Sequence, residues 1–323
     1  MRALQASGKG LDDVTLIEVE PRAPKEGEIR LDLLAMTINP ADLLMLTGDY
    51  GIRPRKPFTP GAEAAARVVE LGPGVDTVRV GDIVLPMPGN CWTETMTIPA
   101  AQTIRMPDGI DLVQAAMLKA NPATASVMLR DIRSLTAGDW VVQNAGNSAV
   151  GQNIVRIAAK RGLNLLSIVR RPEAAEQARA AGAEHVIVDR GEGPIDTDLP
   201  KAQLAFDAVG GRATERLGAL MADGGIVCTY GLLSGQSPRL TAHDLVFRDL
   251  RLKGFWLATW FRTAPPDRIA ATYRELTEWL AEGSIGAPVA ATYDIGDYVE
   301  AIRHAAREGR DGKILLTGQA WPG

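Results

Sequence analysis

The feature that most constrains the fold is an alternation of short apolar runs with helical stretches that begins near residue 140. Residues 140–144, 165–169 and 225–229 are apolar runs of strand length, and residues 150–161 and 172–181 have helical composition. Regular strand–helix alternation produces a parallel sheet with helices packed on its faces. This region is therefore predicted to be an α/β domain with a Rossmann-type, doubly wound parallel sheet.

The preceding ~120 residues have a different character. Residues 14–19 and 28–34 alternate or run apolar, and Pro- and Gly-rich clusters separate such runs. This pattern favours a β-rich domain with long loops. The apolar run at 313–317 is expected to be a strand that returns to it. The predicted domains are a β-rich catalytic domain (1–120 and 261–323) and a Rossmann domain (121–260).

Composition excludes several classes of function. The chain of 323 residues is 46% hydrophobic with a net charge of −4, so it should fold, and a general nucleic-acid role has little support. No apolar run approaches the ~20 residues that cross a bilayer. Two cysteines, Cys91 and Cys228, cannot form a disulfide framework. The N-terminus has no signal-peptide core, so the protein is expected to be cytoplasmic.

A candidate phosphate-binding loop follows the strand predicted at 140–144. Residues 145–151 read Ala-Gly-Asn-Ser-Ala-Val-Gly and lead into a predicted helix. In that context backbone amides and a helix N-terminus face the pyrophosphate of a dinucleotide. Ser148 occupies the middle glycine position of the G-x-G-x-x-G pattern, so an ordinary strand–helix turn is the alternative. The surrounding alternation favours the dinucleotide site.

The end of the next predicted strand indicates which dinucleotide binds. NAD sites place an Asp or Glu there to hold the ribose hydroxyls, but this chain has Arg170 and Arg171. Two guanidinium groups suit a 2′-phosphate. We therefore predict NADPH as the cofactor, with a solvated basic pair as the alternative.

The order of the two domains resembles the medium-chain dehydrogenase/reductase superfamily, which pairs a GroES-like β-rich domain with a Rossmann domain. Many members bind zinc, but Asn39, Ala62 and Ala120 stand at the three ligand positions here. The histidines share no ligand spacing, so no metal is expected. The simpler chemistry is then conjugate reduction, in which a hydride adds to the β-carbon of an activated C=C bond and an acid protonates the α-carbon.

Several short motifs resemble motifs of the mitochondrial-type trans-2-enoyl thioester reductases. They lie at residues 38–42, 48–51, 121–125, 143–152, 229–231 and 247–260. In that family the tyrosine of the Gly-x-Tyr-Gly motif is the proposed proton donor. The resemblance therefore implies that Tyr50 is the catalytic residue. A tyrosine with a pKa near 10 stays protonated at neutral pH and can donate. The alternative is a loop tyrosine, since quinone reductases carry one nearby.

The resemblance also implies substrate and cofactor contacts. Asn39 and Trp256 would contact the substrate, a small molecule or an acyl thioester of coenzyme A or acyl carrier protein. The implied cofactor contacts are Asn121, Asn147, Ser148, Ala149, Val150, Arg170, Arg171, Tyr230, Gly231, Leu232, Leu233, Phe255, Trp256, Leu257 and Lys313. Ala149 departs from the family glycine, and the basic segment 53–57 could meet a phosphate or an acidic carrier, or be a solvated loop.

Three hypotheses of function remain open at this stage. The first is NADPH-dependent reduction of a trans-2-enoyl thioester. The second is an NADPH quinone oxidoreductase or general enone reductase on the same scaffold. The third is an NADPH-binding protein without catalysis. The resemblance also implies a homodimer formed at the sheet edge around residues 250–254. Eukaryotic members carry a mitochondrial presequence, which this chain is expected to lack.

Overall fold

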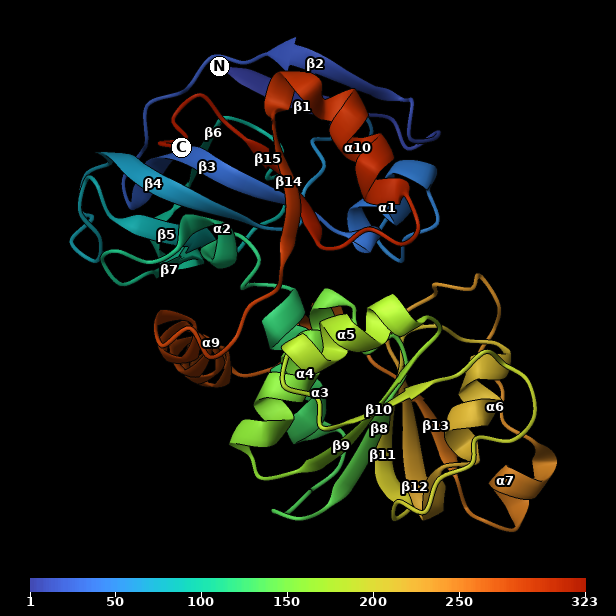
Figure 1. Ribbon diagram of the computed structural model, residues 1–323. Coiled ribbons are helices and arrows are strands. Elements are labelled where there is room, and N and C mark those ends of the chain that lie inside the picture. Colours follow the sequence, from blue (N-terminus) through green and yellow to red (C-terminus); the bar gives the residue numbers. More distant parts are fainter. The chain divides into compact units, whose positions relative to one another are not determined.

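The computed structural model describes residues 1–323 and contains two compact units (Figure 1). Unit 1 comprises Met1–Ala120 and Glu275–Gly323, and unit 2 comprises Asn121–Arg274. The second division lies beyond the expected 260/261, because residues after 260 bond back into unit 2. Trp260 Nε1 and Arg268 Nη2 donate to the Asp131 carboxylate at 3.2 and 2.5 Å.

Unit 2 is built on a six-stranded sheet. Its strands are β8 (Trp140–Gln143), β9 (Asn164–Val169), β10 (His185–Val188), β11 (Ala202–Asp207), β12 (Met221–Thr229) and β13 (Arg251–Gly254), in the order β10-β9-β8-β11-β12-β13. Every pairing is parallel. The chain runs outward from β8 in one direction and then restarts beside it with β11. This doubly wound topology confirms the predicted Rossmann-type sheet.

The helices α4 (Ala149–Lys160), α5 (Pro172–Ala180), α6 (Arg212–Gly218) and α7 (Ala242–Val246) connect strands of this sheet. Helix α3 (Asn121–Asp131) precedes β8, α8 (Leu257–Thr263) follows β13, and α9 (Pro266–Ala281) crosses the division between the units. Ile154, Ile157 and Ala158 lie three or four residues apart on one face of α4 and are fully buried. In Figure 1, α4 and α5 lie beside strands β8 and β9.

Unit 1 contains two sheets. Strands β1 (Arg2–Ala6) and β2 (Val14–Glu18) pair with each other. The larger sheet has the order β14-β15-β3-β4-β5-β7, and β6 also pairs with β3. Its strands are β3 (Glu28–Ile38), β4 (Ala64–Leu71), β5 (Ile83–Pro86), β6 (Thr95–Pro99), β7 (Thr103–Arg105), β14 (Val289–Asp294) and β15 (Lys313–Thr317). The short helices are α1 (Pro40–Thr47), α2 (Leu112–Ala115) and α10 (Tyr298–Ala306), with 3-10 turns η1 (Ala100–Gln102) and η2 (Ile295–Asp297).

The pairing of β15 with β3 incorporates the C-terminal segment into unit 1. The two strands are antiparallel, with Ile314 opposite Ile38 and Leu316 opposite Met36. All five residues of β15 are buried. The expectation that residues 313–317 form a strand of the β-rich part is therefore confirmed.

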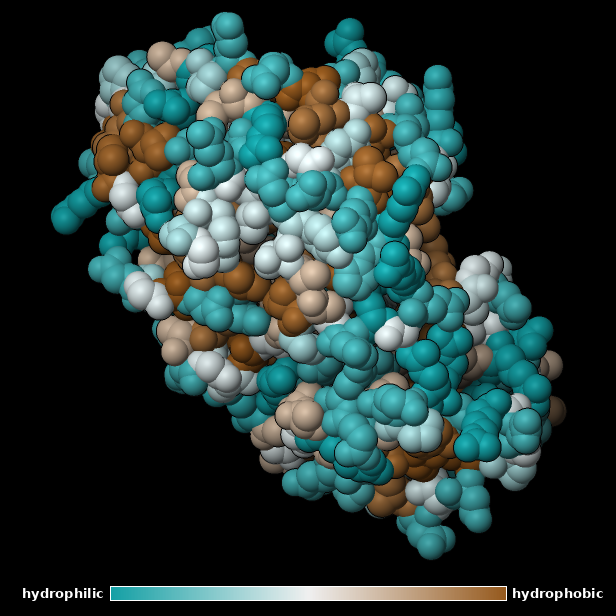
Figure 2. Space-filling model, turned by 45° about the horizontal axis from the view of Figure 1, so that its top comes forward, coloured by the Kyte–Doolittle hydropathy of each residue, from teal (hydrophilic) through white to brown (hydrophobic).

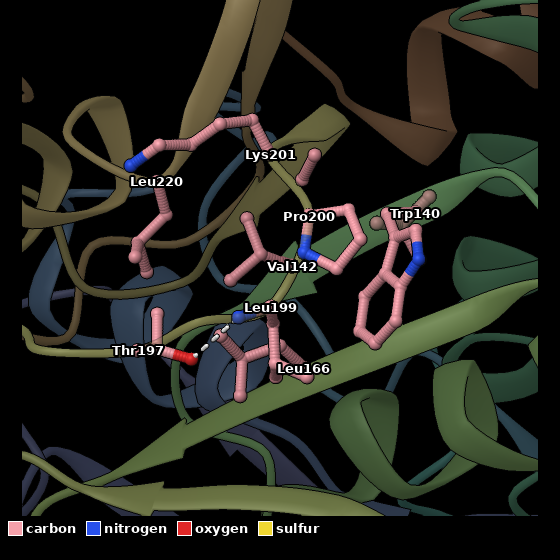
Figure 3. A pocket seen from close by; sticks show the side chains of 10 residues that line it. Trp140, Val142, Leu166, Thr197, Leu199, Pro200, Lys201 and Leu220 are labelled. Carbon is pink, nitrogen blue, oxygen red and sulfur yellow. Dashed lines mark hydrogen bonds between the residues drawn. The ribbon is translucent and has the colours of Figure 1, made fainter.

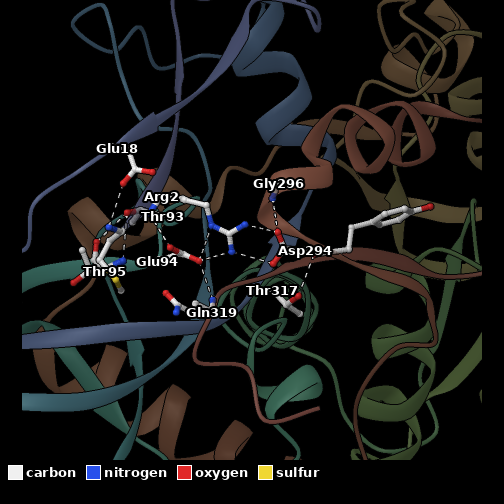
Figure 4. A network of polar contacts seen from close by, with 11 residues as sticks. Arg2, Glu18, Thr93, Glu94, Thr95, Asp294, Gly296, Thr317 and Gln319 are labelled. Atoms are coloured by element: carbon white, nitrogen blue, oxygen red, sulfur yellow. Dashed lines mark hydrogen bonds and ion pairs between the residues drawn. The ribbon is translucent and has the colours of Figure 1, made fainter.

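A polar network fastens the first strand to the C-terminal region of unit 1 (Figure 4). The Arg2 guanidinium donates to Glu94 Oε1 at 2.6 Å and to Asp294 Oδ1 at 2.5 Å. The Gln319 backbone N–H donates to the same Glu94 oxygen at 2.9 Å. Burial alone would raise the pKa of Glu94, but the hydrogen bonds from Arg2 and Gln319 outweigh it and lower that pKa.

No helix is both long and apolar enough to cross a membrane. The face of the molecule shown in Figure 2 mixes hydrophilic and hydrophobic side chains, with apolar patches interrupted by polar ones.

The Arg2 network predicts that Arg2→Met will lower the free energy of unfolding by about 2 kcal/mol, because the substitution leaves the Glu94 carboxylate buried without its guanidinium. Urea unfolding of purified protein measures the change. Arg22→Met is the matched control, since Arg22 pairs with Glu28 at 2.6 Å on the surface and should matter less. Equal losses in the two variants would contradict the structural role given to Arg2.

Candidate active site

Two of the three positions that the resemblance matches to zinc ligands, Asn39 and Ala120, bond to one carboxylate in unit 1. Asn39 immediately precedes α1, and its Nδ2 donates to Glu63 Oε1 at 2.8 Å. The Ala120 backbone N–H donates to Glu63 Oε2 at 2.7 Å. Glu63 itself is fully buried. It therefore links segments that are far apart in the sequence.

Two buried lysines complete this cluster. Lys313 Nζ donates to Asn39 Oδ1, so the Asn39 carboxamide connects the Lys313 ammonium with the Glu63 carboxylate. Lys119 Nζ donates to the backbone carbonyls of Ala62 and Pro88 at 2.5 and 3.2 Å. The two lysines are 5% and 9% exposed, so both ammonium groups are removed from bulk water.

These residues do not fit a zinc ion. Ala62 and Ala120 have no ligating side chain, and the Asn39 carboxamide oxygen already accepts from an ammonium. Zinc needs three or four N, S or O ligands, and no group of three or more His, Cys, Asp or Glu side chains is arranged to hold a metal.

Burial shifts the protonation of the cluster. It raises the pKa of Asp42 to about 7, against the effect of the Asn39 N–H, which donates to Asp42 Oδ2 at 2.8 Å. It also raises the pKa of Glu63, although Lys313 opposes the change. Burial lowers the pKa of Lys313 to about 8. Opposite charges in one buried cluster thus restrain shifts that desolvation alone would make larger.

Tyr50 lies in the loop after α1. Gly48 ends the helix with a φ of 81°, in the left-handed region that glycine favours. The Tyr50 N–H donates to the Leu44 carbonyl at 3.1 Å, which ties the loop to the last turn. The Tyr50 side chain is half-buried, whereas Arg53, Arg55 and Lys56 after it are exposed. The structure therefore leaves the phenol partly accessible.

The candidate cofactor residues of unit 2 gather at one edge of its sheet. They follow the carboxyl ends of parallel strands: Asn147, Ser148, Ala149 and Val150 after β8, Arg170 and Arg171 after β9, Tyr230, Gly231, Leu232 and Leu233 after β12, and Phe255, Trp256 and Leu257 after β13. In doubly wound sheets this edge binds the dinucleotide, at the point where the strand order reverses.

The loop after β8 fits a pyrophosphate. Ser148 is the N-cap of α4, and its Oγ accepts from the Gly151 N–H at 3.0 Å. A Cβ on Gly151 would lie 2.6 Å from the Ala145 carbonyl oxygen, and one on Gly146 would lie 2.8 Å from Ser167 Cβ. Both glycines are therefore required by close packing. The amides of the first turn of α4 have no intrahelical acceptor, so they can bind an anion.

The two arginines have the exposure that a 2′-phosphate needs. Arg170 and Arg171 are exposed after β9, and Arg171 is the N-cap residue of α5. Asn147 Nδ2 donates to Gln177 Oε1 on α5 at 2.9 Å. The phosphate loop and the helix that carries the arginine pair are thus joined within unit 2.

Trp256 stands at the start of α8. The Arg262 guanidinium lies 5.1 Å from the centre of the Trp256 ring, a cation–π contact that restricts the indole. Trp260 is buried, as expected for a core residue.

Asn121 and Lys313 do not follow sheet strands of unit 2. Asn121 begins α3 and is 7% exposed, and Lys313 belongs to the cluster of unit 1. Their cofactor contacts remain predictions.

Sequence reasoning missed two residues at the point of strand reversal. Asn144 directly follows β8 and Asp207 ends the neighbouring β11, and Asn144 Nδ2 donates to Asp207 Oδ1 at 2.6 Å. Asp207 also accepts from the Gly210 N–H at 2.9 Å and from Thr214 Oγ1 at 2.7 Å. The sequence did offer a signal for Asn144 and Asp207, because each is a polar residue at the end of an apolar run. Glu63 was missed as well, because the sequence gives no sign of its partners.

A separate cavity lies at the opposite, amino-terminal ends of the strands (Figure 3). It is lined by residues that include Trp140, Leu166, Thr197 and Pro200, and its volume of about 10 Å³ is room for one water. None of the candidate site residues lines it, so it is not a substrate site.

The raised pKa of Asp42 predicts a pH-dependent stability difference. A carboxyl with a pKa near 7 in the folded protein and near 4 when unfolded binds more protons in the folded state between these values. Its contribution to stability is therefore lost as pH rises from about 4 to about 7. Asp42→Asn does not titrate and retains an acceptor for the Asn39 N–H. Urea unfolding of both proteins from pH 5 to 8 should show the wild type losing about 2–4 kcal/mol relative to the variant. A difference independent of pH would contradict the shift.

Comparison with known proteins identifies the two parts of the chain. Residues 25–108 match the family described as "Alcohol dehydrogenase GroES-like domain", and residues 149–282 match "Zinc-binding dehydrogenase". Among solved structures, a putative NADPH:quinone reductase from Bacillus thuringiensis has a TM-score of 0.87 at 27% identity, with 98% of each chain covered. The Etr1p/NADP/crotonyl-CoA complex has a TM-score of 0.86 at 24% identity, covering 98% of this chain and 99% of the other. The fold class predicted from the sequence is thus confirmed.

Curated relatives narrow the family. The human mitochondrial enoyl-[acyl-carrier-protein] reductase is 34% identical over 315 residues, covering 94% of this chain and 84% of the relative. The Arabidopsis thaliana enzyme of the same name is 32% identical over 261 residues, covering 77% and 70%. The expectation of a cytoplasmic location is wrong in this light, because these relatives are named as mitochondrial proteins. The chain belongs to the medium-chain dehydrogenase/reductase superfamily and, within it, to the mitochondrial-type enoyl-[acyl-carrier-protein] reductase family.

Proposed function

We propose that this protein is an NADPH-dependent oxidoreductase that reduces the C=C bond of a trans-2-enoyl thioester of coenzyme A or acyl carrier protein to the saturated acyl thioester. The observation that carries the proposal is the set of dinucleotide-binding segments at the carboxyl edge of the unit 2 sheet. The names of the curated relatives support the substrate class. A structural neighbour described as a complex with NADP and crotonyl-CoA supports both substrate and cofactor.

The cofactor is held by residues of unit 2. The first-turn amides of α4 bind the pyrophosphate, and Ser148 fixes that turn by capping it. Arg170 and Arg171 bind the 2′-phosphate with charge-assisted hydrogen bonds, which an NADH ribose would leave unused. When bound, NADPH supplies the hydride. Segments 230–233 and 255–257 extend the binding surface along the same edge.

Residues of unit 1 supply the proton and the polar surroundings of the carbonyl. Tyr50 donates the proton from its phenolic oxygen to the α-carbon, as a half-buried tyrosine at the end of a fixed turn can. Asn39 takes part in holding the substrate carbonyl, and Trp256, restricted by Arg262, places the acyl group.

A quinone or general enone reductase is the second candidate. The observation that favours it is the likeness to a putative NADPH:quinone reductase, at 27% identity and a TM-score of 0.87. Crotonyl-CoA and 1,4-naphthoquinone assayed side by side with NADPH distinguish the two. We expect turnover of crotonyl-CoA; turnover of the quinone alone would reject the first proposal. Tight NADPH binding without turnover of either would indicate a binding protein.

A homodimer formed along the β13 edge is part of the proposal. Strand β13 ends the sheet of unit 2, and all four of its residues are exposed. The neighbouring Val246 and Phe247 are 70% and 76% exposed. An edge strand with unpaired backbone groups beside exposed apolar side chains is suited to pairing with a second copy.

The arginine pair predicts a selective effect on cofactor use. The double variant Arg170→Ala/Arg171→Ala should raise the KM for NADPH by about 10- to 100-fold and change the KM for NADH little, because only NADPH carries the 2′-phosphate. Steady-state kinetics with each cofactor measures this. Arg179→Ala, which removes an exposed arginine of the same helix that pairs with Glu176, is the control and should leave both values unchanged. An equal rise for both cofactors would refute the assignment.

The role of Tyr50 predicts a loss in turnover without a loss in binding. Tyr50→Phe should lower kcat by about 10²-fold, because it removes the general acid but preserves the ring. NADPH binding, followed by its fluorescence, should stay the same. Tyr298→Phe is the matched control in unit 1, where Tyr298 Oη donates to the Val14 carbonyl at 3.2 Å. If kcat of the Tyr50 variant equals that of the control, Tyr50 has no part in the reaction.

A further inference from the structure

The buried cluster of unit 1 contains a bridge between two opposite charges. The Asn39 carboxamide donates through Nδ2 to Glu63 at 2.8 Å and accepts through Oδ1 from Lys313. A carboxamide carries a donor and an acceptor on the two arms of one planar group, so Asn39 can bond to both charges at once. The bridge therefore fixes the orientation of Asn39 and connects a carboxylate to an ammonium.

The three residues of this bridge are buried, so the loss of either charged partner should destabilise unit 1. Glu63 is fully buried, and Asn39 and Lys313 are each 5% exposed. A buried charge without a counter-charge is strongly destabilising. Asp42 and Lys119 are also buried in this cluster, so two acidic and two basic side chains lie within it. Glu63 is the acidic residue that bonds to the bridge.

The second bond of Glu63 extends the cluster to the end of unit 1. Its Oε2 accepts from the Ala120 N–H at 2.7 Å, and Lys119 holds the carbonyl of Ala62 at 2.5 Å. The segments around residues 39, 62 and 120 are thus cross-linked by side chains. In zinc-binding members of the superfamily a metal ion would connect these three positions.

We propose that Glu63 is a positioning residue of unit 1, which ties Asn39 to the Ala120 backbone and, through the Asn39 carboxamide, holds the buried Lys313 ammonium in place. Glu63 thereby sets the orientation of Asn39 and the charge environment of Lys313. The functional part of this inference rests on the proposed function, in which Asn39 contacts the substrate and Lys313 contacts the cofactor.

The test is a double-variant cycle with two readouts. Glu63→Gln and Lys313→Met each leave one buried charge unbalanced, so each should lower the Tm by about 10 °C. The combined variant is neutral at both positions and should recover part of that loss, because the two side chains interact. NADPH binding should weaken about tenfold in Glu63→Gln. In the combined variant NADPH binding should stay weak, since the ammonium is absent.

Glu94→Gln is the matched control. Glu94 is buried in the same unit and pairs with Arg2 at 2.6 Å (Figure 4), so its variant should lower the Tm and leave NADPH binding unchanged. Tm losses that simply add in the combined variant would overturn the proposal. So would NADPH binding by Glu63→Gln equal to that of Glu94→Gln. A wrong function would appear separately, as wild-type protein that binds NADPH but reduces no enoyl thioester, while the unfolding cycle would still report on the bridge.

Discussion

The antiparallel pairing of β15 with β3 is the interaction on which unit 1 depends. Ile314 lies opposite Ile38, and the adjoining residues Lys313 and Asn39 bond through their side chains. This pairing joins residues 274 positions apart and brings the ammonium of one to the carboxamide of the other. A shift of one residue would turn the Lys313 side chain to the other face of the sheet. The buried charge balance of unit 1 therefore depends on strand register before it depends on any single hydrogen bond.

In unit 2 the candidate site residues are brought together by the topology of the parallel sheet. In a parallel sheet every strand ends at the same edge, so segments from four strands meet there without a dedicated contact for each. The buried Asp207, with its bonds to Asn144 and Thr214, holds the two strands at the reversal point in a fixed arrangement. Polar side chains at this depth are stable because several donors satisfy the same carboxylate.

Much of unit 2 could be predicted from the sequence because its signals are local. The alternation of apolar runs and helices determines a parallel sheet, and Arg170 and Arg171 are adjacent in the sequence. Unit 1 is different, because its site is assembled from distant segments. That Asn39, Ala62 and Ala120 replace zinc ligands could be inferred from resemblance, but periodicity does not show that Asn39 and Ala120, far apart in the sequence, both bond to Glu63. The cytoplasmic location expected from the N-terminal residues is contradicted by the curated relatives, which are named as mitochondrial proteins.

Departures from the family pattern are compensated by neighbouring residues in both units. Ser148 interrupts the glycine pattern, yet a serine at an N-cap accepts a backbone N–H, which glycine cannot do. Asn39 stands where a thiolate would bind zinc, yet its carboxamide accepts from one buried charge and donates to another. In each case the substituted side chain has become part of a hydrogen-bond arrangement that stabilises the local backbone. A replaced consensus residue can therefore keep the local backbone stable even where, as at Asn39, the ligand of the consensus residue no longer fits.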